Sequence, residues 1–289
     1  MAEATVPGAP MPARALTRGE RRRLDLTYQP GFRSIAYFCV AFLYAPVLIL
    51  VAFAFNENRS VTTWTSFSLK WFHEVAANEY IRAAAILSLE IAAVATIGAT
   101  ICATLAALAT TRTLPYRGMG TAYVFINLPL MVPEIVTAVA TLSFFALGRV
   151  VLGIDLAPLK LNLMLAHMVF CIPFAYLPIR ARLSDMDRTL EQAAADLYAT
   201  PWHAFRRITL PLLTPGIIAG AMLAFIVSID DFTITQLVAG PGQTTLPIYI
   251  YGQIRRGITP ATNAASTILL VVSVIFVSLV FFLGQRRKR

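Results

Sequence analysis

Residues 191–215 read EQAAADLYATPWHAFRRITLPLLTP, a polar segment that lies between long apolar runs. Its first part, Glu191–Asp196, is rich in Ala, Glu and Gln, which favour the helical conformation. Thr200 followed by Pro201 is typical of a second helix start, because threonine caps free amides and proline needs no donor in the first turn. The segment therefore predicts two short helices on a polar loop.

The second predicted helix carries an apolar face. Trp202, Phe205 and Ile208 recur at intervals of three residues, so they share one side of a helix. Leu210-Pro211 is predicted to end this helix, and Thr214-Pro215 to begin the next. An apolar patch on a polar loop usually marks an interface with a partner. The alternative is that the patch packs on neighbouring helices of the same chain.

The composition is that of a membrane protein. Hydrophobic residues make up 57% of the chain and charged residues only 13%, whereas soluble domains carry about 25% charged residues. Runs of about 20 apolar residues cross a bilayer as helices, since lipid offers no partner for free backbone groups. Six such runs predict an all-α membrane domain, residues 34–284, with spans at 34–55, 81–110, 119–147, 161–179, 211–229 and 263–283.

Basic residues indicate how these spans are oriented. Residues 1–33 form a tail rich in Ala, Pro and Arg, and residues 285–289 form a short basic tail. With the N-terminus inside, the cytoplasmic segments, including the loop 180–210, hold 17 of the 24 Lys and Arg residues. The positive-inside rule therefore predicts that both termini and this loop are cytoplasmic. The basic runs are expected to meet membrane lipid and not nucleic acid.

Two segments on the other side of the membrane differ in character. Asn56–Tyr80 carries Trp64, Trp71 and Phe72, which suit a stretch lying at the membrane interface. Gly240-Pro-Gly242 interrupts the region between the fifth and sixth spans, so a loop that bends back is predicted there.

Four acidic residues fall within or at the edge of the spans: Glu90, Glu134, Asp230 and Asp231. A charged carboxylate at the bilayer centre costs roughly 2.5–3.5 kcal/mol, so such residues normally face a bundle interior or a solute route. No Lys or Arg lies deep in the same spans to neutralise them. This asymmetry favours a cationic solute. The alternative is a structural role in hydrogen bonding or as protonated acids.

Prolines are predicted to disturb the third span. Pro129 and Pro133 remove backbone hydrogen bonds and should kink or break a helix just before Glu134. Broken helices often line the solute route in transporters, so Met131–Ile135 is a candidate gate. The alternative is a kink that serves packing alone.

The order Gln192-Ala193-Ala194, Ala199, Phe205, Ile208 and Leu210-Pro211 resembles the "EAA" coupling loop of binding-protein-dependent ABC importer permeases. The resemblance implies that the loop docks into a cleft of an ATPase subunit and passes its movements to the spans. Glu191 and Trp202 are expected to take part in this coupling site. Gln192 stands at the family's usual glutamate and Tyr198 at its usual glycine. Tyr198 is expected at the bend between the helices, where glycine would adopt positive φ freely.

The resemblance extends over nearly all of residues 34–284. Segments similar to those of spermidine and putrescine permeases are Leu43–Pro46, Ser228–Phe232, Gly240–Pro247 and Thr259–Asn263. It implies the six-span type I importer permease fold in the bacterial inner membrane, and a polyamine carried from periplasm to cytoplasm. The implied partners are two ATP-binding subunits, a second permease subunit and a periplasmic solute-binding protein.

The sequence contains no motif typical of ATP hydrolysis or of a metal site. It has no Gly-x-x-x-x-Gly-Lys-Ser/Thr phosphate loop, so we expect a non-enzymatic subunit whose partner ATPase binds ATP and Mg²⁺. His167 and Cys171 are four residues apart, but two ligands are too few for a metal site, and no cofactor is expected. Two alternatives stay open. One is the same importer class with another small organic cation or amino-acid derivative, and the other is an ion-coupled secondary transporter.

Overall fold

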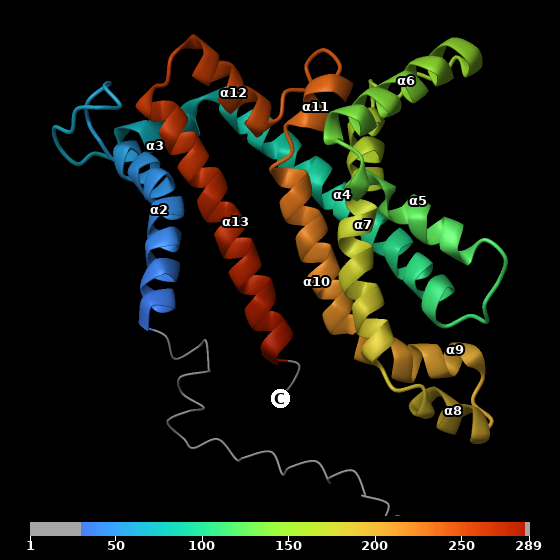
Figure 1. Ribbon diagram of the computed structural model, residues 1–289. Helices are drawn as coiled ribbons and strands as arrows, with labels where there is room; N and C mark the ends of the chain where they lie inside the picture. The colour runs from blue at the N-terminus through green and yellow to red at the C-terminus, as the bar shows by residue number, and fades with distance from the viewer. Residues whose placement is uncertain (1–29, 287–289) are drawn as a thin grey trace, which may run out of the picture. The chain divides into compact units, whose positions relative to one another are not determined.

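The computed structural model describes residues 30–286, which form an all-α chain (Figure 1). Within this range the only β-type pairing is a single bridge between Asn56 and Phe67. Six of the described helices are long and apolar enough to cross a membrane, so the predicted fold class is confirmed. The elements are α2 (Pro30–Ala54), α3 (Lys70–Ala77), α4 (Glu79–Thr111), α5 (Met119–Met131), α6 (Glu134–Leu152), α7 (Leu161–Asp185), α8 (Thr189–Asp196), α9 (Pro201–Ala204), the π-helix η2 (Phe205–Thr209), α10 (Leu210–Ile229), α11 (Thr233–Val238), α12 (Leu246–Arg256) and α13 (Pro260–Arg286).

The chain divides into two compact units, with the boundary after Ala52. The described part of the first unit is nearly all of α2, an apolar helix that contains Pro46 and in which Phe38 and Phe42 stack one turn apart. The second unit holds all the other helices. Of the two tails predicted from the sequence, residues 1–29 and 287–289 lie outside the described residues.

Helices α4, α7 and α10 pack against one another and form the core of the second unit (Figure 1). On α4, alanines repeat every three or four residues and so lie on one helix face, where each is fully buried: Ala92, Ala95, Ala99, Ala103 and Ala107. On α10, a Cβ atom at Gly220 would lie 2.6 Å from the carbonyl oxygen of Ala175 on α7. Small residues therefore let these three helices approach closely, which is how helices associate inside a bilayer.

The third expected span, 119–147, is two helices in the structure. α5 ends at Met131, Val132 is extended (ψ 139°), and α6 begins at Glu134 after Pro133. A proline disfavours the helical conformation of the residue before it, which accounts for the break at Val132. Pro129, by contrast, lies inside α5. Only α6, which runs on to Leu152, has the length of a span.

The helix expected to end at Leu210-Pro211 continues instead, and the prediction of a new helix at Thr214-Pro215 is also wrong. α9, η2 and α10 follow one another without a gap, so a single helical rod runs from Pro201 to Ile229. Pro211 has no amide hydrogen to give to the preceding turn, and the π-helical turn Phe205–Thr209 ends two residues before it. The widened turn carries the helix past the proline, as π-bulges do inside α-helices.

The segment expected at the membrane interface is partly buried. Trp71 on α3 is 3% exposed, and its Nε1 donates a hydrogen bond of 2.6 Å to the carbonyl oxygen of Asn56. The Asn56 side chain binds the backbone of Ser60, Thr63 and Thr65, which shapes the loop before α3. Trp64 is about half exposed. Trp71 is thus a packing residue because its indole N–H has a partner within the fold.

The predicted bend at Gly240–Gly242 is present between α11 and α12. Gln243 holds it in place: its Oε1 accepts from the Gly240 amide at 2.8 Å and from Asn162 Nδ2 at 2.9 Å, and its Nε2 donates to Ala157. Asn162 also donates to Val238 at 2.9 Å. These bonds attach the bend to the start of α7.

Candidate functional site

The segment that follows α7 forms a compact helical loop, residues 186–209, and its last part, Pro201–Thr209, is also the start of the Pro201–Ile229 rod. α7 extends to Asp185, so the loop is shorter than the 180–210 expected. Asp187 Oδ1 accepts from the Thr189 amide at 2.9 Å, and this backbone bond lowers the pKa of the Asp187 carboxyl. Thr200 accepts from the His203 amide, so it caps α9 as its sequence position indicates.

Tyr198 lies at the bend between α8 and α9 with φ of 59°. This left-handed conformation is one that glycine adopts without steric cost and that a side chain with Cβ disfavours. The ring is 97% exposed, so it gains no packing contact in return. Backbone bonds hold the bend, since the Tyr198 amide donates to Ala195 and the Ala199 amide to Ala194.

Large apolar side chains are exposed on the 186–209 loop. Leu197 is 82% exposed and Trp202 is 68% exposed, on either side of Tyr198. The Trp202 ring stacks on Phe205 at 5.6 Å. The other residues that the sequence predicted for the coupling site differ in burial. Ala194 is buried, and Gln192, Ala193 and Pro211 are exposed. The half-buried ones are Glu191, Ala199, Phe205, Ile208 and Leu210. A surface of this kind on a polar loop is typical of an interface.

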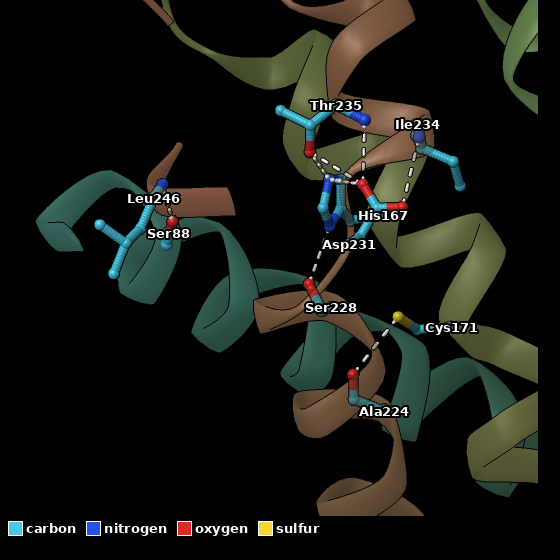
Figure 2. A network of polar contacts seen from close by, with 9 residues as sticks. All are labelled: Ser88, His167, Cys171, Ala224, Ser228, Asp231, Ile234, Thr235 and Leu246. Carbon is cyan, nitrogen blue, oxygen red and sulfur yellow. Dashed lines mark hydrogen bonds and ion pairs between the residues drawn. The ribbon is translucent and has the colours of Figure 1, made fainter. Parts of the chain in front are cut away.

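The opposite end of α10 carries a buried polar cluster of four side chains, His167, Ser228, Asp231 and Thr235 (Figure 2). Asp231 Oδ1 accepts from the Ile234 amide at 3.2 Å, and Oδ2 accepts from the Thr235 amide and hydroxyl, each at 2.9 Å. These amides belong to the first turn of α11, which has no other partner for them inside the helix. Asp231 therefore caps α11.

His167 joins three helices within this cluster. Its Nδ1 lies 2.9 Å from Ser228 Oγ on α10, and its Nε2 lies 2.9 Å from Thr235 Oγ1 on α11 and 3.4 Å from Asp231 Oδ2. Because the Thr235 hydroxyl donates to Asp231, it accepts from Nε2–H. A neutral imidazole then accepts at Nδ1 from the Ser228 hydroxyl. The cluster is thus a directed chain of hydrogen bonds that ends on the Asp231 carboxylate.

Asp230, next to Asp231 in sequence, has a different environment. It is exposed and lines a cavity of about 480 Å³ between α10, α12 and α13. The rings of Phe232 and Tyr251 line the same cavity 4.5 Å apart, and Arg255 lies over Tyr251 at 5.0 Å. Among residues 30–286, no ion pair involves Asp230. Its carboxylate is available to a cation, and the volume is within the about 300–1,000 Å³ of small-molecule pockets.

The other two acids of the spans are placed apart from each other. The Glu134 carboxyl group, at the start of α6, interacts with the side chains of Asp231 and Thr233. Glu90 on α4 forms an ion pair with Lys160, with Nζ and Oε2 2.7 Å apart. Lys160 lies at the N-terminal boundary of α7, so no Lys or Arg is deep within that span, but a base from 70 residues away still neutralises Glu90, which the sequence did not indicate. Glu134 and Asp230 thus both lie near Asp231, whereas the Glu90 carboxylate is paired with Lys160.

Sequence analysis missed several residues that the structure brings to these sites. Arg112, at the end of α4, contacts Glu191 of the 186–209 loop. Leu197 is among the most exposed apolar side chains of that loop, and Tyr251 faces the Asp230 cavity. Only Leu197 could have been found from sequence, as an apolar residue beside the predicted bend. The other contacts join elements far apart in the chain.

Comparison with known proteins shows where this architecture occurs. Residues 99–289 match the family described as "Binding-protein-dependent transport system inner membrane component". The chain belongs to this family. The match includes the 186–209 loop, which carries the exposed loop surface, and α7, α10 and α11, which hold the polar cluster.

Relatives with curated names extend this membership over most of the chain. The "Putrescine transport system permease protein PotI" of Escherichia coli strain K12 is 39% identical over 229 residues, which are 79% of this chain and 82% of that protein. The "Spermidine/putrescine transport system permease protein PotC" of the same strain is 35% identical over 249 residues, 86% of this chain and 90% of that protein. The resemblance to importer permeases of this type is therefore confirmed.

A solved structure shares the fold. A chain of a bacterial ABC transporter that imports the acidic polysaccharide alginate superposes with a TM-score of 0.75 and covers 94% of this chain and 99% of its own length. Its sequence identity is 18%, so the likeness concerns the fold. The two chains thus share the same helical fold.

Proposed function

We propose that this chain is the permease subunit of an ATP-driven importer that carries putrescine and spermidine across the bacterial inner membrane into the cytoplasm. The observation that carries the proposal is the 39% identity to a putrescine permease and the 35% identity to a spermidine/putrescine permease, each over most of both chains. The free carboxylate and aromatic rings of the Asp230 cavity support a cationic cargo.

The energy for import comes from ATP hydrolysis by two separate ATP-binding subunits. ATP and Mg²⁺ bind there, and this chain needs no cofactor of its own. The exposed side chains of Leu197, Tyr198 and Trp202 support docking of an ATPase on the 186–209 loop. With the loop in the cytoplasm, both termini are cytoplasmic as well. A second permease subunit completes the route, and a periplasmic binding protein delivers the solute at the opposite end.

Within the route, the two adjacent acids have separate tasks. Asp230 meets an ammonium group of the solute, since its carboxylate is exposed in a cavity and lies outside every ion pair among the described residues. Phe232 and Tyr251 add ring faces that attract cations. Asp231 holds α11 and stays with its donors. The break at Pro133 lets Glu134 approach this end of the route.

Uptake of radiolabelled putrescine and spermidine tests the proposal. The cells lack polyamine transporters of their own and express the complete set of importer genes, with the ATPase either intact or carrying a replaced phosphate-loop lysine. We expect uptake only with the intact ATPase, and competition by unlabelled polyamine. Uptake that ignores the dead ATPase would contradict the ATP-driven mechanism. An active ATPase without polyamine uptake would contradict the cargo.

A further inference from the structure

A three-residue clamp joins the 186–209 loop to the end of α4. Its members are Arg112, Glu191 and Thr209. Glu191 Oε1 accepts from Arg112 Nε at 3.1 Å and from Thr209 Oγ1 at 2.9 Å. One carboxylate oxygen thus ties together α8, the last turn of α4 and the π-helical turn before α10.

The clamp is shielded from solvent. The Arg112 side chain is 13% exposed and that of Glu191 is 25% exposed, while Thr209 is buried. Arg112 also reaches the carbonyl of Met186 at 3.4 Å, at the end of α7. Shielding strengthens a charge pair, because the effective dielectric constant falls away from bulk water. The clamp is therefore not one of the weak surface ion pairs that salt screens out.

Besides the clamp, α8 packs on α9 and on the π-helical turn, with Ala194 buried there. A cavity of about 340 Å³ separates α8 from α9 and the end of α4, with Leu108, Glu191 and Phe205 among its lining residues. The other polar contact from this part of the loop is that of Arg188 with the carbonyl of Thr111, again at the end of α4. A displacement of α8 thus reaches α4 through the clamp and through Arg188, and among the described residues the clamp is the ion pair between the two helices.

α4 extends this connection to the opposite end. The helix has 33 residues, a length of about 50 Å at 1.5 Å per residue. Near its other end, Ser88 Oγ accepts from the Leu246 amide at 2.8 Å, at the start of α12 (Figure 2). Glu90 pairs with Lys160 at the start of α7. One rigid helix therefore links the 186–209 loop with α12, which lines the Asp230 cavity.

We propose that Glu191 is a positioning residue of the importer: through the Arg112–Glu191–Thr209 clamp it transmits the movement of α8 to α4. The inference rests on the proposed function and deepens it. We expect Gln192 and not Glu191 to meet the ATPase, because Gln192 is exposed, whereas Glu191 is 25% exposed and its Oε1 is bonded inside the fold. The ATPase moves the loop surface, and the clamp couples this surface to the solute route.

The first test separates coupling from docking. The complete importer, reconstituted in liposomes with its binding protein, is compared for Glu191→Gln, Arg112→Glu and the exchange Arg112→Glu with Glu191→Arg. We expect Glu191→Gln to keep the ATPase subunits bound and to hydrolyse ATP, while putrescine uptake per ATP falls about tenfold, a typical coupling factor between linked sites. The exchange of both residues should restore a large part of the uptake per ATP that Arg112→Glu alone loses. Glu74→Gln, which makes the same change at an exposed position on α3, outside the loop, should transport normally.

A second readout does not depend on the cargo. In a background without the three native cysteines, spin labels at Ala195 on α8 and at Leu114 just beyond α4 report their separation with and without ATP. We expect the separation to stay constant in the wild type and to change with ATP in Glu191→Gln. If the wild-type importer takes up no putrescine, the proposed cargo is wrong, but the label distances still test the clamp because they do not depend on the solute. Normal uptake per ATP in Glu191→Gln, loss of the ATPase subunits from it, or an unchanged label separation would overturn the clamp.

Discussion

The two ends of the Pro201–Ile229 rod differ in how far their side chains are buried and hydrogen-bonded. At the α11 end, the polar cluster of His167, Ser228, Asp231 and Thr235 is buried, and each member has a hydrogen-bond partner within the chain. At the other end, the 186–209 loop exposes large apolar side chains and holds Tyr198 in a backbone conformation that costs free energy.

The difference shows which end of the rod is satisfied within this chain and which end needs contact with a partner protein. The polar cluster needs nothing further, because a buried carboxylate with three donors is already satisfied. The surface of Leu197, Tyr198 and Trp202 remains in water until another protein covers it. Substitutions in the cluster should therefore change the stability of the subunit, whereas substitutions on the loop surface should change its coupling to the ATPase.

The largest effect is expected from Trp202→Asp. A charge on the exposed loop surface would be buried without a partner in the docked complex, and hot-spot residues of this kind contribute about 2 kcal/mol or more, or roughly thirtyfold in affinity. Uptake should fall by about this factor or more, with the subunit still in the membrane. Co-purification of the ATPase measures docking, and Trp202→Phe serves as the control that keeps an aromatic ring. Full co-purification with Trp202→Asp would refute the loop surface as the docking site.

The adjacent acids provide the next test. Asp230→Asn should raise the apparent KM for putrescine about tenfold, since one charge contact with an ammonium group is lost, and should leave the melting temperature unchanged. Asp231→Asn should lower the melting temperature, because both carboxylate oxygens accept hydrogen bonds and the asparagine NH2 would face a donor in place of one of them. Uptake kinetics and thermal melting of the purified importer are measured on both variants. Equal loss of stability in the two would remove the distinction between them.

A smaller change is expected from Thr235→Val within the polar cluster. The variant keeps the side-chain shape but removes the donor to Asp231 and the acceptor of His167 Nε2. Stability should fall by about 1–2 kcal/mol. Thr214→Val on α10 is the matched control, because its hydroxyl bonds only the Leu210 carbonyl of its own helix. Thermal melting in detergent compares the two, and an equal shift in both would count against the cluster as a stabilising unit.

The smallest effect is expected from Tyr198→Gly. Glycine adopts positive φ at no steric cost, so the isolated subunit should become more stable in the 186–209 loop by up to about 1 kcal/mol. Hydrogen exchange of the loop amides measures this change. Faster exchange in the glycine variant would show that the tyrosine ring stabilises the bend, contrary to its exposure of 97%.

Local signals predicted much of this fold. Apolar runs indicated the long helices, Thr200-Pro201 marked the start of α9, and Pro133 marked the break before α6. Periodicity failed where one interaction overrode local preference. The π-helical turn lets the helix continue past Pro211. The hydrogen bond from Trp71 Nε1 to the Asn56 carbonyl allows the indole ring to be buried. Neither effect has a signature in a short window of sequence.

The sites were less predictable than the fold. The acids could be found by their position in apolar runs, but the sequence does not show that Asp230 is exposed in a cavity and that Asp231 is buried and caps α11. Arg112 and Glu191 are 79 residues apart, and Lys160 and Glu90 are 70 apart. Such pairs depend on how the helices pack, which local patterns do not determine.

The most direct test of the central claim is putrescine accumulation in liposomes that contain the purified importer, its ATPase and its binding protein, with no ion gradient across the membrane. The account predicts accumulation with ATP, none with ATP excluded, and none when Trp202→Asp replaces the wild-type permease. Accumulation that follows an imposed ion gradient and ignores ATP would contradict it, and would identify the chain as an ion-coupled transporter.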